Sequence, residues 1–161
     1  MSVIEYRSIG IIHSPFTQIA GMPIQPAGAR GVEGTVEVEE QYAGGLKDLE
    51  GFSHIHLIYH FHRSEGFDLQ VVPFLDNRER GVLATRAPRR PNPIGLSTVR
   101  LLEVNGNILT IANVDILDGT PLLDIKPAVP EFELLEERTL GWLENSVKSV
   151  SGLRSDKRFR K

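Results

Sequence analysis

"LSTVRLLEVNGNILTIANVDIL", residues 96–117, is the stretch that decides the fold class. Two runs rich in apolar and β-branched residues flank the pair Asn105-Gly106. Such a pair between alternating hydrophobic residues is a strong short-range signal of a β-hairpin. We therefore expect two neighbouring antiparallel strands that turn at Asn105-Gly106.

Shorter segments of the same character lie on both sides of this hairpin. By apolar content or alternation, strands are expected at residues 7–14, 34–40, 54–62, 81–85 and 121–127. Residues 42–52 predict one or two helical turns that Gly51 stops, and from about Phe132 to Val150 the pattern turns helical. Since strands dominate and the only long helix comes last, we expect a mainly β protein rather than a doubly wound sheet. The expected fold is a small, partly closed β-barrel with peripheral helices, including a C-terminal helix.

The chain has 161 residues, enough for one domain with a core of its own. We place that domain at residues 1–150 and a basic C-terminal tail at residues 151–161. No cysteine is present, which excludes disulfides and every site that needs a thiolate. Neither a signal-peptide core nor an apolar run of spanning length is found, so we expect a cytoplasmic protein without a membrane partner.

Positive charge is concentrated in two places, although the net charge is −3. Residues 78–100 sum to +5 and residues 154–161 to +4. Local basic density governs contact with phosphates, because electrostatic fields are screened beyond a Debye length. For the tail alone, a frayed end is the simpler interpretation.

The first basic region contains "TRAPRRPNPIGLS", residues 85–97, in which three arginines are interspersed with three prolines. Proline lacks a backbone donor and fixes φ, which excludes a helix interior and a central strand. The proline-bearing part, residues 85–93, is called the Arg/Pro loop below. Its rigidity favours a functional role over that of an ordinary solvated loop.

The expected strand at residues 54–62 carries His54, His56, His60 and His62 on one face. Two His-x-His pairs could bind zinc if a carboxylate completed the site. Residues 54 and 62 lie about 26 Å apart on an extended strand, however, so no single ion can take all four. One pair with a distant ligand stays an alternative. The favoured interpretation is a polar cavity lining that includes one functional histidine, with no metal.

The glycine motifs of Rossmann-type and P-loop nucleotide sites are missing, as is the G-x-S-x-G motif of serine hydrolases. The other dense polar cluster is "DILDGTPLLDIKP", residues 115–127. Asp118-Gly119 predicts a tight turn, and Thr120-Pro121 predicts an extended exit from it. Taken alone, this segment fits a satisfied hairpin turn as well as a binding site.

Together these segments resemble a known family. "ATRAPRRPNPIGLS", followed about twenty residues later by "DILDGTPLLDIKP", is the double signature of the TsaA-like, or TrmO, proteins. The resemblance covers roughly residues 6–135. It implies a small β-barrel that works as a homodimer and uses S-adenosyl-L-methionine. The implied reaction is methylation of N6-threonylcarbamoyladenosine beside the anticodon, so the implied partner is the anticodon stem-loop of tRNA.

The resemblance also implies a cofactor pocket built from four segments. The residues carried over are Pro26, Ala27, Gly28, His62, Arg63, Arg86, Leu96, Asp118, Gly119, Thr120 and Pro121. A sulfonium cofactor needs polar groups around its amino-acid end and an apolar slot for its adenine. In this interpretation the prolines fix the Arg/Pro loop as a pocket wall, and its arginines face the cofactor carboxylate and the tRNA backbone.

Roles in the reaction follow from the chemistry of that substrate. Arg90 and Lys126 are the candidates to hold the carboxylate of the threonylcarbamoyl group, and Asn92 could orient its carbamoyl part. Asp115 or Asp118 could accept a hydrogen bond from the reacting nitrogen.

Three positions depart from the family pattern. Ala87 stands where serine is usual, Ala128 where tyrosine is common, and "QPAG" replaces the commoner "QPG". Two other functions stay open at this point. One is a methyltransferase of the same fold that acts on another nucleic acid or on a small amine. The other is a non-catalytic barrel that binds S-adenosyl-L-methionine.

Overall fold

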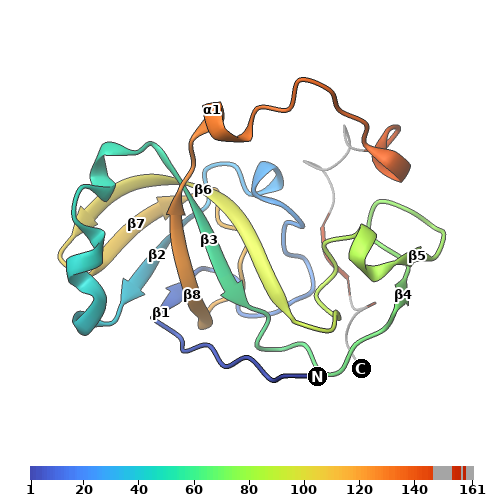
Figure 1. Ribbon diagram of the computed structural model, residues 1–161, viewed down its shortest axis with the longest axis horizontal. Coiled ribbons are helices and arrows are strands. Elements are labelled where there is room, and N and C mark those ends of the chain that lie inside the picture. Colours follow the sequence, from blue (N-terminus) through green and yellow to red (C-terminus); the bar gives the residue numbers. More distant parts are fainter. Residues whose placement is uncertain (147–153, 157, 159–161) are drawn as a thin grey trace.

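Six antiparallel strands form a closed barrel in the computed structural model, which describes residues 1–146, 154–156 and 158 (Figure 1). The strands are β1 (Gly10–His13), β2 (Glu33–Val38), β3 (His54–His60), β6 (Ile94–Asn105), β7 (Ile108–Ala112) and β8 (Thr120–Pro127). Their order around the barrel is β1-β2-β7-β6-β3-β8, and β1 pairs with β8 to close it. The expected mainly β barrel is therefore confirmed, and it is closed rather than partly closed.

The barrel interior is filled by alternate residues of its strands. The fully buried members include Ile12, Val36, Ile55, Leu57, Val99, Leu109, Ile111 and Leu122. The alternation expected for residues 54–62 is confirmed, because Ile55, Leu57 and Tyr59 point inward and the histidines between them do not. One stretch of sequence thus supplies both a core face and a polar outer face.

The β6–β7 hairpin forms, with its turn one residue later than expected and with β7 ending at Ala112, so the strand expected to reach residue 117 is wrong beyond Ala112. Asn105 pairs with Ile108, so the two turn residues are Gly106 and Asn107. Gly106 has a φ of 60°, whereas Asn107 is not among the residues with positive φ. A two-residue turn with positive φ only at its first central position is of type II′, for which glycine is preferred there.

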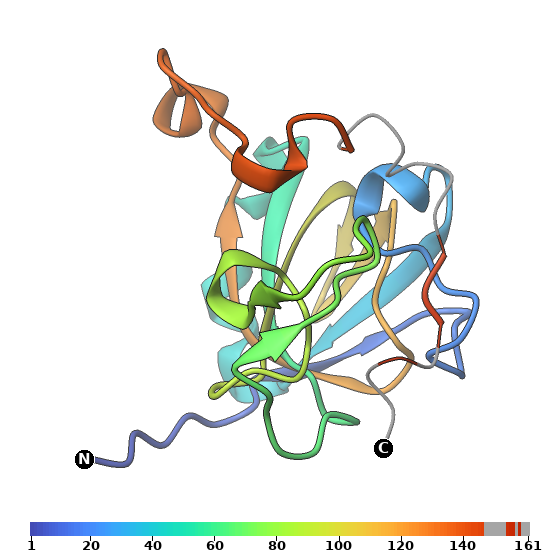
Figure 2. The same cartoon turned by 90° about the vertical axis from the view of Figure 1, so that its right-hand side faces the viewer.

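A smaller layer lies beside the barrel, in front of it in Figure 2. It contains the two-stranded ladder of β4 (Gln70–Val71) with β5 (Arg80–Gly81) and the 3₁₀ helix η4 (Val82–Ala84). The expected strand at residues 81–85 is therefore wrong beyond Gly81. Val82 turns inward to pack with Val71 and Ala87, and the amide of Thr85 donates to the carbonyl of Val82.

The other helices are short and peripheral. They are the 3₁₀ helices η1 (Pro26–Gly28), η2 (Glu40–Leu46) and η3 (Leu49–Gly51), the α-helix α1 (Pro130–Glu133) and the 3₁₀ helix η5 (Gly141–Leu143). The helical turns expected at residues 42–52 are confirmed as η2 and η3. None of the helices in the described part of the chain has the length and apolar character that crossing a bilayer requires.

The expected C-terminal helix is represented only by the short elements α1 and η5. The chain leaves helical geometry at Leu134, so a continuous helix from about residue 132 is wrong as far as residue 146. Residues 147–150 of that expectation lie outside the described residues. Phe132, Leu134 and Leu135 are exposed by 86%, 76% and 71%. A helix gains most of its stability from burying an apolar face, and these side chains bury little here.

The described residues of the tail are anchored rather than frayed. Ser155 forms backbone hydrogen bonds of 2.7 and 2.8 Å with Met22 and Gly21. The guanidinium of Arg158 pairs with Asp156 at 2.8 Å and lies 5.0 Å from the centre of the Phe74 ring. The division into a domain of residues 1–150 and a tail of residues 151–161 stays a prediction.

Candidate functional site

A cavity of about 1080 Å³ lies where one end of the barrel meets the smaller layer. Its wall combines loop residues 19–27, the end of β3 with the loop that follows, residues 73–75, the Arg/Pro loop with the start of β6, residues 115–117, and η5. These segments lie far apart in the sequence, and the barrel and the elements packed beside it bring them together. A cavity of this size can hold a ligand as large as a nucleoside cofactor.

Most of the residues proposed from the sequence line this cavity. They are Ala27, His62, Arg63, Arg86, Arg90, Asn92, Leu96, Asp115 and Thr120. They come from all four segments that the family resemblance singled out and from the set proposed for catalysis. The cavity therefore gathers most of the candidate site in one place.

The remaining candidates are not part of the cavity wall. They are Pro26, Gly28, Asp118, Gly119, Pro121 and Lys126. Within η1 only Ala27 belongs to the wall. Pro121 is paired with Ile11 in the seam between β1 and β8, and the amide of Gly119 donates to the carbonyl of Ile12. These two positions hold the barrel closed next to the site.

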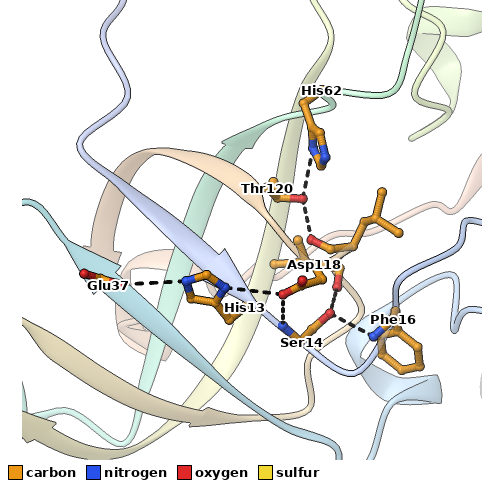
Figure 3. Close-up of polar contacts among 9 residues, drawn as sticks. His13, Ser14, Phe16, Glu37, His62, Asp118 and Thr120 are labelled. Carbon is orange, nitrogen blue, oxygen red and sulfur yellow. Dashed lines mark hydrogen bonds and ion pairs between the residues drawn. The ribbon is translucent and has the colours of Figure 1, made fainter.

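Asp118 fixes the turn that precedes β8. Its Oδ1 accepts a 3.0 Å hydrogen bond from the amide of Ser14 and lies 3.4 Å from Nδ1 of His13 (Figure 3). In the same view the Oγ1 of Thr120 lies 3.3 Å from Nδ1 of His62. The contacts of the Asp118 carboxylate thus run to the end of β1, and Thr120 is the residue of this turn that reaches the cavity.

Lys126 lies away from the cavity, on the outer side of the barrel. Its side chain is 62% exposed, and its ammonium pairs with Asp124 at 2.9 Å. In the ladder Lys126 is paired with His56, several residues before β3 reaches the cavity. Of the two cations proposed to hold the substrate carboxylate, only Arg90 lines the cavity.

The arginines of the Arg/Pro loop have three different environments. Arg86 is exposed at the cavity and donates a 3.0 Å hydrogen bond to Gln25. Arg90 donates from Nη1 to the carbonyls of Thr85 and Ala87, so it also braces the loop.

Arg89 differs from its two neighbours because it is only 8% exposed. Its Nε pairs with Asp68 at 2.9 Å, and it also donates to the carbonyl of Glu65. The expectation that all three arginines face the cofactor and the tRNA backbone is therefore wrong for Arg89. This guanidinium binds the loop to the segment after β3 instead.

A chain of polar side chains crosses the wall of the cavity. The hydroxyl of Ser97 donates to Oδ1 of Asp115 at 2.7 Å, and the Tyr59 hydroxyl lies 3.0 Å from the Ser97 oxygen. Since the single hydrogen of the Ser97 hydroxyl is used toward Asp115, Tyr59 is the donor in the second bond. Tyr59 and Asp115 line the cavity, and Ser97 is buried behind them.

Burial shifts the acid–base behaviour of this chain. Desolvation raises the pKa of Asp115 to about 6, against the opposing effects of the Ser97 hydrogen bond, the backbone and the charge of Arg86. Desolvation likewise raises the pKa of Tyr59, so this hydroxyl stays protonated and acts as a donor. Desolvation, with Arg63 and His60, lowers the pKa of His62, which favours a neutral ring there.

Apolar side chains form another part of the wall. Leu83, Ile94 and Leu96 line the cavity while remaining exposed by 78%, 41% and 49%. Trp142 of η5 also lines it, and its ring nitrogen donates a 2.9 Å hydrogen bond to the carbonyl of Ala84. A flat aromatic ligand such as an adenine ring could pack on this part of the wall.

The histidines of residues 54–62 do not form one cavity lining. Of the four, only His62 reaches the large cavity. His54 lies in a shallow outer depression, and His56 contacts Thr98 and Glu133 outside the barrel. The expected polar lining is thus wrong for His54, His56 and His60 at this cavity. The outward alternation of β3 carries them away from it.

The zinc alternative finds no ligand set in residues 1–146 or in the described tail residues, where no three His, Asp or Glu side chains come together around a possible ion. Independence from metal stays a prediction. Methyl transfer measured in the presence of a chelator would test it, and activity that is lost on chelation and restored by zinc alone would contradict it.

The fold and the site define a class of protein: a closed antiparallel barrel with a mixed polar and apolar ligand cavity at one end. The sequence model of one family, described as the tRNA-methyltransferase O N-terminal domain, matches residues 11–134. The chain belongs to this family.

Curated relatives share most of the chain. A probable S-adenosyl-L-methionine-binding protein of Pyrococcus abyssi is 58% identical over 157 residues, covering 98% of this chain and 85% of that protein. A tRNA (adenine(37)-N6)-methyltransferase of Escherichia coli is 35% identical over 156 residues, covering 91% of this chain and 66% of that enzyme.

A solved structure shows the same fold. The crystal structure of TrmO from Pseudomonas aeruginosa matches with a TM-score of 0.74 and 35% identity, over 88% of this chain and 63% of that chain. The present chain therefore spans about two thirds of the length of these bacterial proteins.

Proposed function

We propose that this protein is an S-adenosyl-L-methionine-dependent methyltransferase that methylates N6 of adenosine 37, next to the tRNA anticodon. The observation that carries the proposal is the cavity that gathers both signature loops of the family. Relatives named as tRNA (adenine(37)-N6)-methyltransferases support the reaction, and a relative named as an S-adenosyl-L-methionine-binding protein supports the cofactor.

The chemistry of the cavity fits this cofactor. Arg86 supplies a guanidinium, whose planar donors match a carboxylate in a bidentate manner. Leu83, Leu96 and Trp142 supply apolar surface for an adenine ring. When bound, S-adenosyl-L-methionine supplies an electrophilic methyl group on its sulfonium sulfur. The residues of this chain would bind and orient the two reactants, which is a major source of acceleration in a bimolecular transfer.

The specific substrate in this proposal is the threonylcarbamoylated form of that adenosine. Its terminal carboxylate needs a cation inside the cavity, and Arg90 lies in the wall. Asn92, also in the wall, can donate to the carbamoyl oxygen or accept from its N–H. The competing function, a barrel that binds the cofactor without catalysis, predicts cofactor binding and no methyl transfer to any tRNA.

We further propose that the protein acts in the cytoplasm as a homodimer. The exposed apolar residues at the rim of the cavity, Leu83, Ile94 and Leu96, are the part of the site that a second copy could cover. In sedimentation equilibrium, we expect a molecular mass twice the chain mass of 17.9 kDa. A monomer at micromolar concentration would contradict it.

Replacing Arg86 with alanine should weaken binding of S-adenosyl-L-methionine at least tenfold. A tenfold loss corresponds to about 1.4 kcal/mol, and hydrogen bonds to charged groups typically contribute somewhat more. Titration calorimetry on the wild type and the variant measures the effect directly. Arg100→Ala is a control of equal charge, since Arg100 is exposed on β6 and is not part of the cavity wall. Equal affinities in all three proteins would remove Arg86 from the site.

The reaction is tested by incubating the protein with the cofactor and with tRNA that carries threonylcarbamoyladenosine, followed by mass spectrometry of the nucleosides. A new methylated nucleoside at that position is the expected result. Cofactor binding without any product would favour the non-catalytic barrel. Product on another base or on a small amine would favour the other methyltransferase.

A further inference from the structure

The hydrogen-bonded side chains that cross the cavity wall end on a carboxylate, which two buried hydroxyl groups hold from behind. Asp115 lines the cavity, while the Ser97 and Tyr59 hydroxyls follow it in one hydrogen-bonded chain. Both hydroxyl groups belong to strands of the closed barrel, Tyr59 to β3 and Ser97 to β6, and these residues are 5% and 2% exposed. A carboxylate held in this way by rigid elements is preorganised.

We propose that Asp115 is the proton acceptor of the methyl transfer, and that Ser97 and Tyr59 are positioning residues that orient its carboxylate toward the cavity. This inference rests on the proposed function. The sequence leaves Asp115 and Asp118 as alternatives. Asp115 is chosen as the proton acceptor because the Asp118 carboxylate contacts Ser14 and His13 instead.

In this step a bond forms between the transferred methyl carbon and N6, and the bond between that carbon and sulfur breaks with its electron pair left on sulfur. The proton of N6 passes to the Asp115 carboxylate. The products are S-adenosyl-L-homocysteine with a neutral sulfur, the methylated nucleoside and a neutral carboxylic acid. Exchange with solvent through the cavity mouth then restores the carboxylate.

The arrangement suits a base that works near neutral pH. The pKa of Asp115 is raised to about 6 by burial, so the group is ionised at pH 7 and yet binds a proton more readily than an ordinary carboxylate. The titratable and charged groups that act on it are Tyr59 from β3 and Arg86 from the Arg/Pro loop. His62, Arg63 and Arg90 line the same cavity.

The hydroxyl hydrogens of the chain all point toward the carboxylate. Tyr59 donates to Ser97, and Ser97 donates to Oδ1 of Asp115. A hydrogen bond donated to an ionised carboxylate stabilises that form, so Ser97 keeps the pKa of Asp115 from rising further. Loss of the Ser97 hydroxyl should therefore shift the titration of Asp115 to higher pH.

His62 is the competing base, because it lines the same cavity and its lowered pKa leaves the ring neutral and able to accept a proton. It lies beyond the end of β3, in the segment that the family resemblance assigns to the cofactor. The experiment must therefore separate the two residues.

The test combines binding, titration and rate measurements on the full chain. Asp115→Asn keeps the size of the side chain and its ability to accept from Ser97, so the fold should be retained. We expect its single-turnover rate to fall about 100-fold or more, in the range of general-base effects. The affinity of this variant for S-adenosyl-L-methionine, measured by calorimetry, should change by less than about threefold. Arg86, the residue proposed to bind the cofactor carboxylate, is unchanged in it. The rise of the wild-type rate through about pH 6 should disappear in this variant.

Ser97→Ala tests the positioning role, because a purely structural role of Ser97 would not change the pH at which Asp115 titrates. The midpoint of the rate profile, and the carboxyl carbon titration of Asp115 followed by NMR in the ligand-free protein, should both shift to higher pH. Thr98→Ala removes the neighbouring hydroxyl of β6, which contacts His56 outside the barrel, and should leave both midpoints in place.

Two results would overturn the inference. One is an Asp115→Asn enzyme with the wild-type rate and pH profile. The other is a His62→Gln enzyme that loses the rise through pH 6 while Asp115→Asn retains it. If the wild type itself fails to methylate threonylcarbamoylated tRNA, it is the proposed function that fails. The NMR titration still reports the coupling between Ser97 and Asp115 in that case.

Discussion

Transfer RNA that lacks the threonylcarbamoyl group should be methylated at least about 100-fold more slowly than tRNA that carries it. A site built to pair with a charged group penalises a substrate without that group, because the donors of the site are then left unsatisfied; such discrimination reaches about 10⁴-fold in enzymes that read a polar group. Arg90 is the candidate donor in the cavity wall. Its bonds to Thr85 and Ala87 use Nη1, so the guanidinium can offer further N–H groups to a carboxylate.

Single-turnover rates on the two tRNAs measure this discrimination, and two variants locate its source. Arg90→Ala should reduce the ratio of the two rates, because only methylation of the threonylcarbamoylated tRNA should become slower. Lys126→Ala should leave this ratio unchanged, since the Lys126 ammonium pairs with Asp124 outside the cavity. A denaturation curve on Arg90→Ala checks that the Arg/Pro loop still folds. Equal wild-type rates on both tRNAs would rule out recognition of the carboxylate.

Gly95→Ala should be among the most destabilising single substitutions in this protein. A Cβ at position 95 would lie 2.2 Å from Cε2 of Tyr59, and 2.5 and 2.8 Å from two more atoms of that ring. Tyr59 is 5% exposed, its ring packs against Phe61 edge to face, and its hydroxyl bonds Ser97, so displacing the ring breaks both contacts. Overpacking of this kind costs about 3 kcal/mol in a well-packed interior.

Urea denaturation, with the slope compared between proteins, measures the loss. Gly44→Ala is the matched control, because a Cβ there meets nothing within 4 Å and the backbone φ is not positive. Its stability should stay within about 0.5 kcal/mol of the wild type. If Gly95→Ala proves as stable as Gly44→Ala, the close packing of Tyr59 on β6 is not a constraint on the fold.

The barrel strands can be predicted from the sequence where local pattern and tertiary role agree. The hairpin predicted at residues 96–117 has both the alternation and the turn residues. It runs from Ile94 to Ala112, and its turn lies one residue later than predicted. Residues 81–85 have the apolar content of a strand, yet Val82 is used to fill a small cluster outside the barrel. Phe132 and its neighbours have helical spacing, but nothing in the described structure buries their apolar face.

The site can be predicted in composition but not in arrangement. Two loops rich in arginine, proline and aspartate point to Arg86, Arg90, Asp115 and Thr120, all of which line the cavity. That Arg89 is turned inward toward Asp68 cannot be read from the sequence, because neighbouring arginines of one loop look alike.

The sequence does not identify Tyr59 and Ser97 as site residues, because each lies on the inner face of a strand, where apolar packing is expected. Ser97 does carry a signal, since strict alternation along β6 places this hydroxyl between the inward residues Gly95 and Val99. A polar side chain at an inward position needs a partner. The position of that partner, Asp115, follows only from the closed barrel.

The pairing of β1 with β8 at their seam has a consequence for the order in which the protein folds. Gly10 meets Leu122 and Ile12 meets Thr120 across it, so the first strand cannot complete its pairing until more than one hundred further residues have been synthesised. Pairings this distant in sequence slow folding to the range of milliseconds to seconds in all-β domains. Until β8 has been synthesised, the edge of β1 that pairs with it has no partner strand. Because Thr120 belongs both to this seam and to the cavity wall, the protein should gain its ligand affinity only when β1 and β8 have paired.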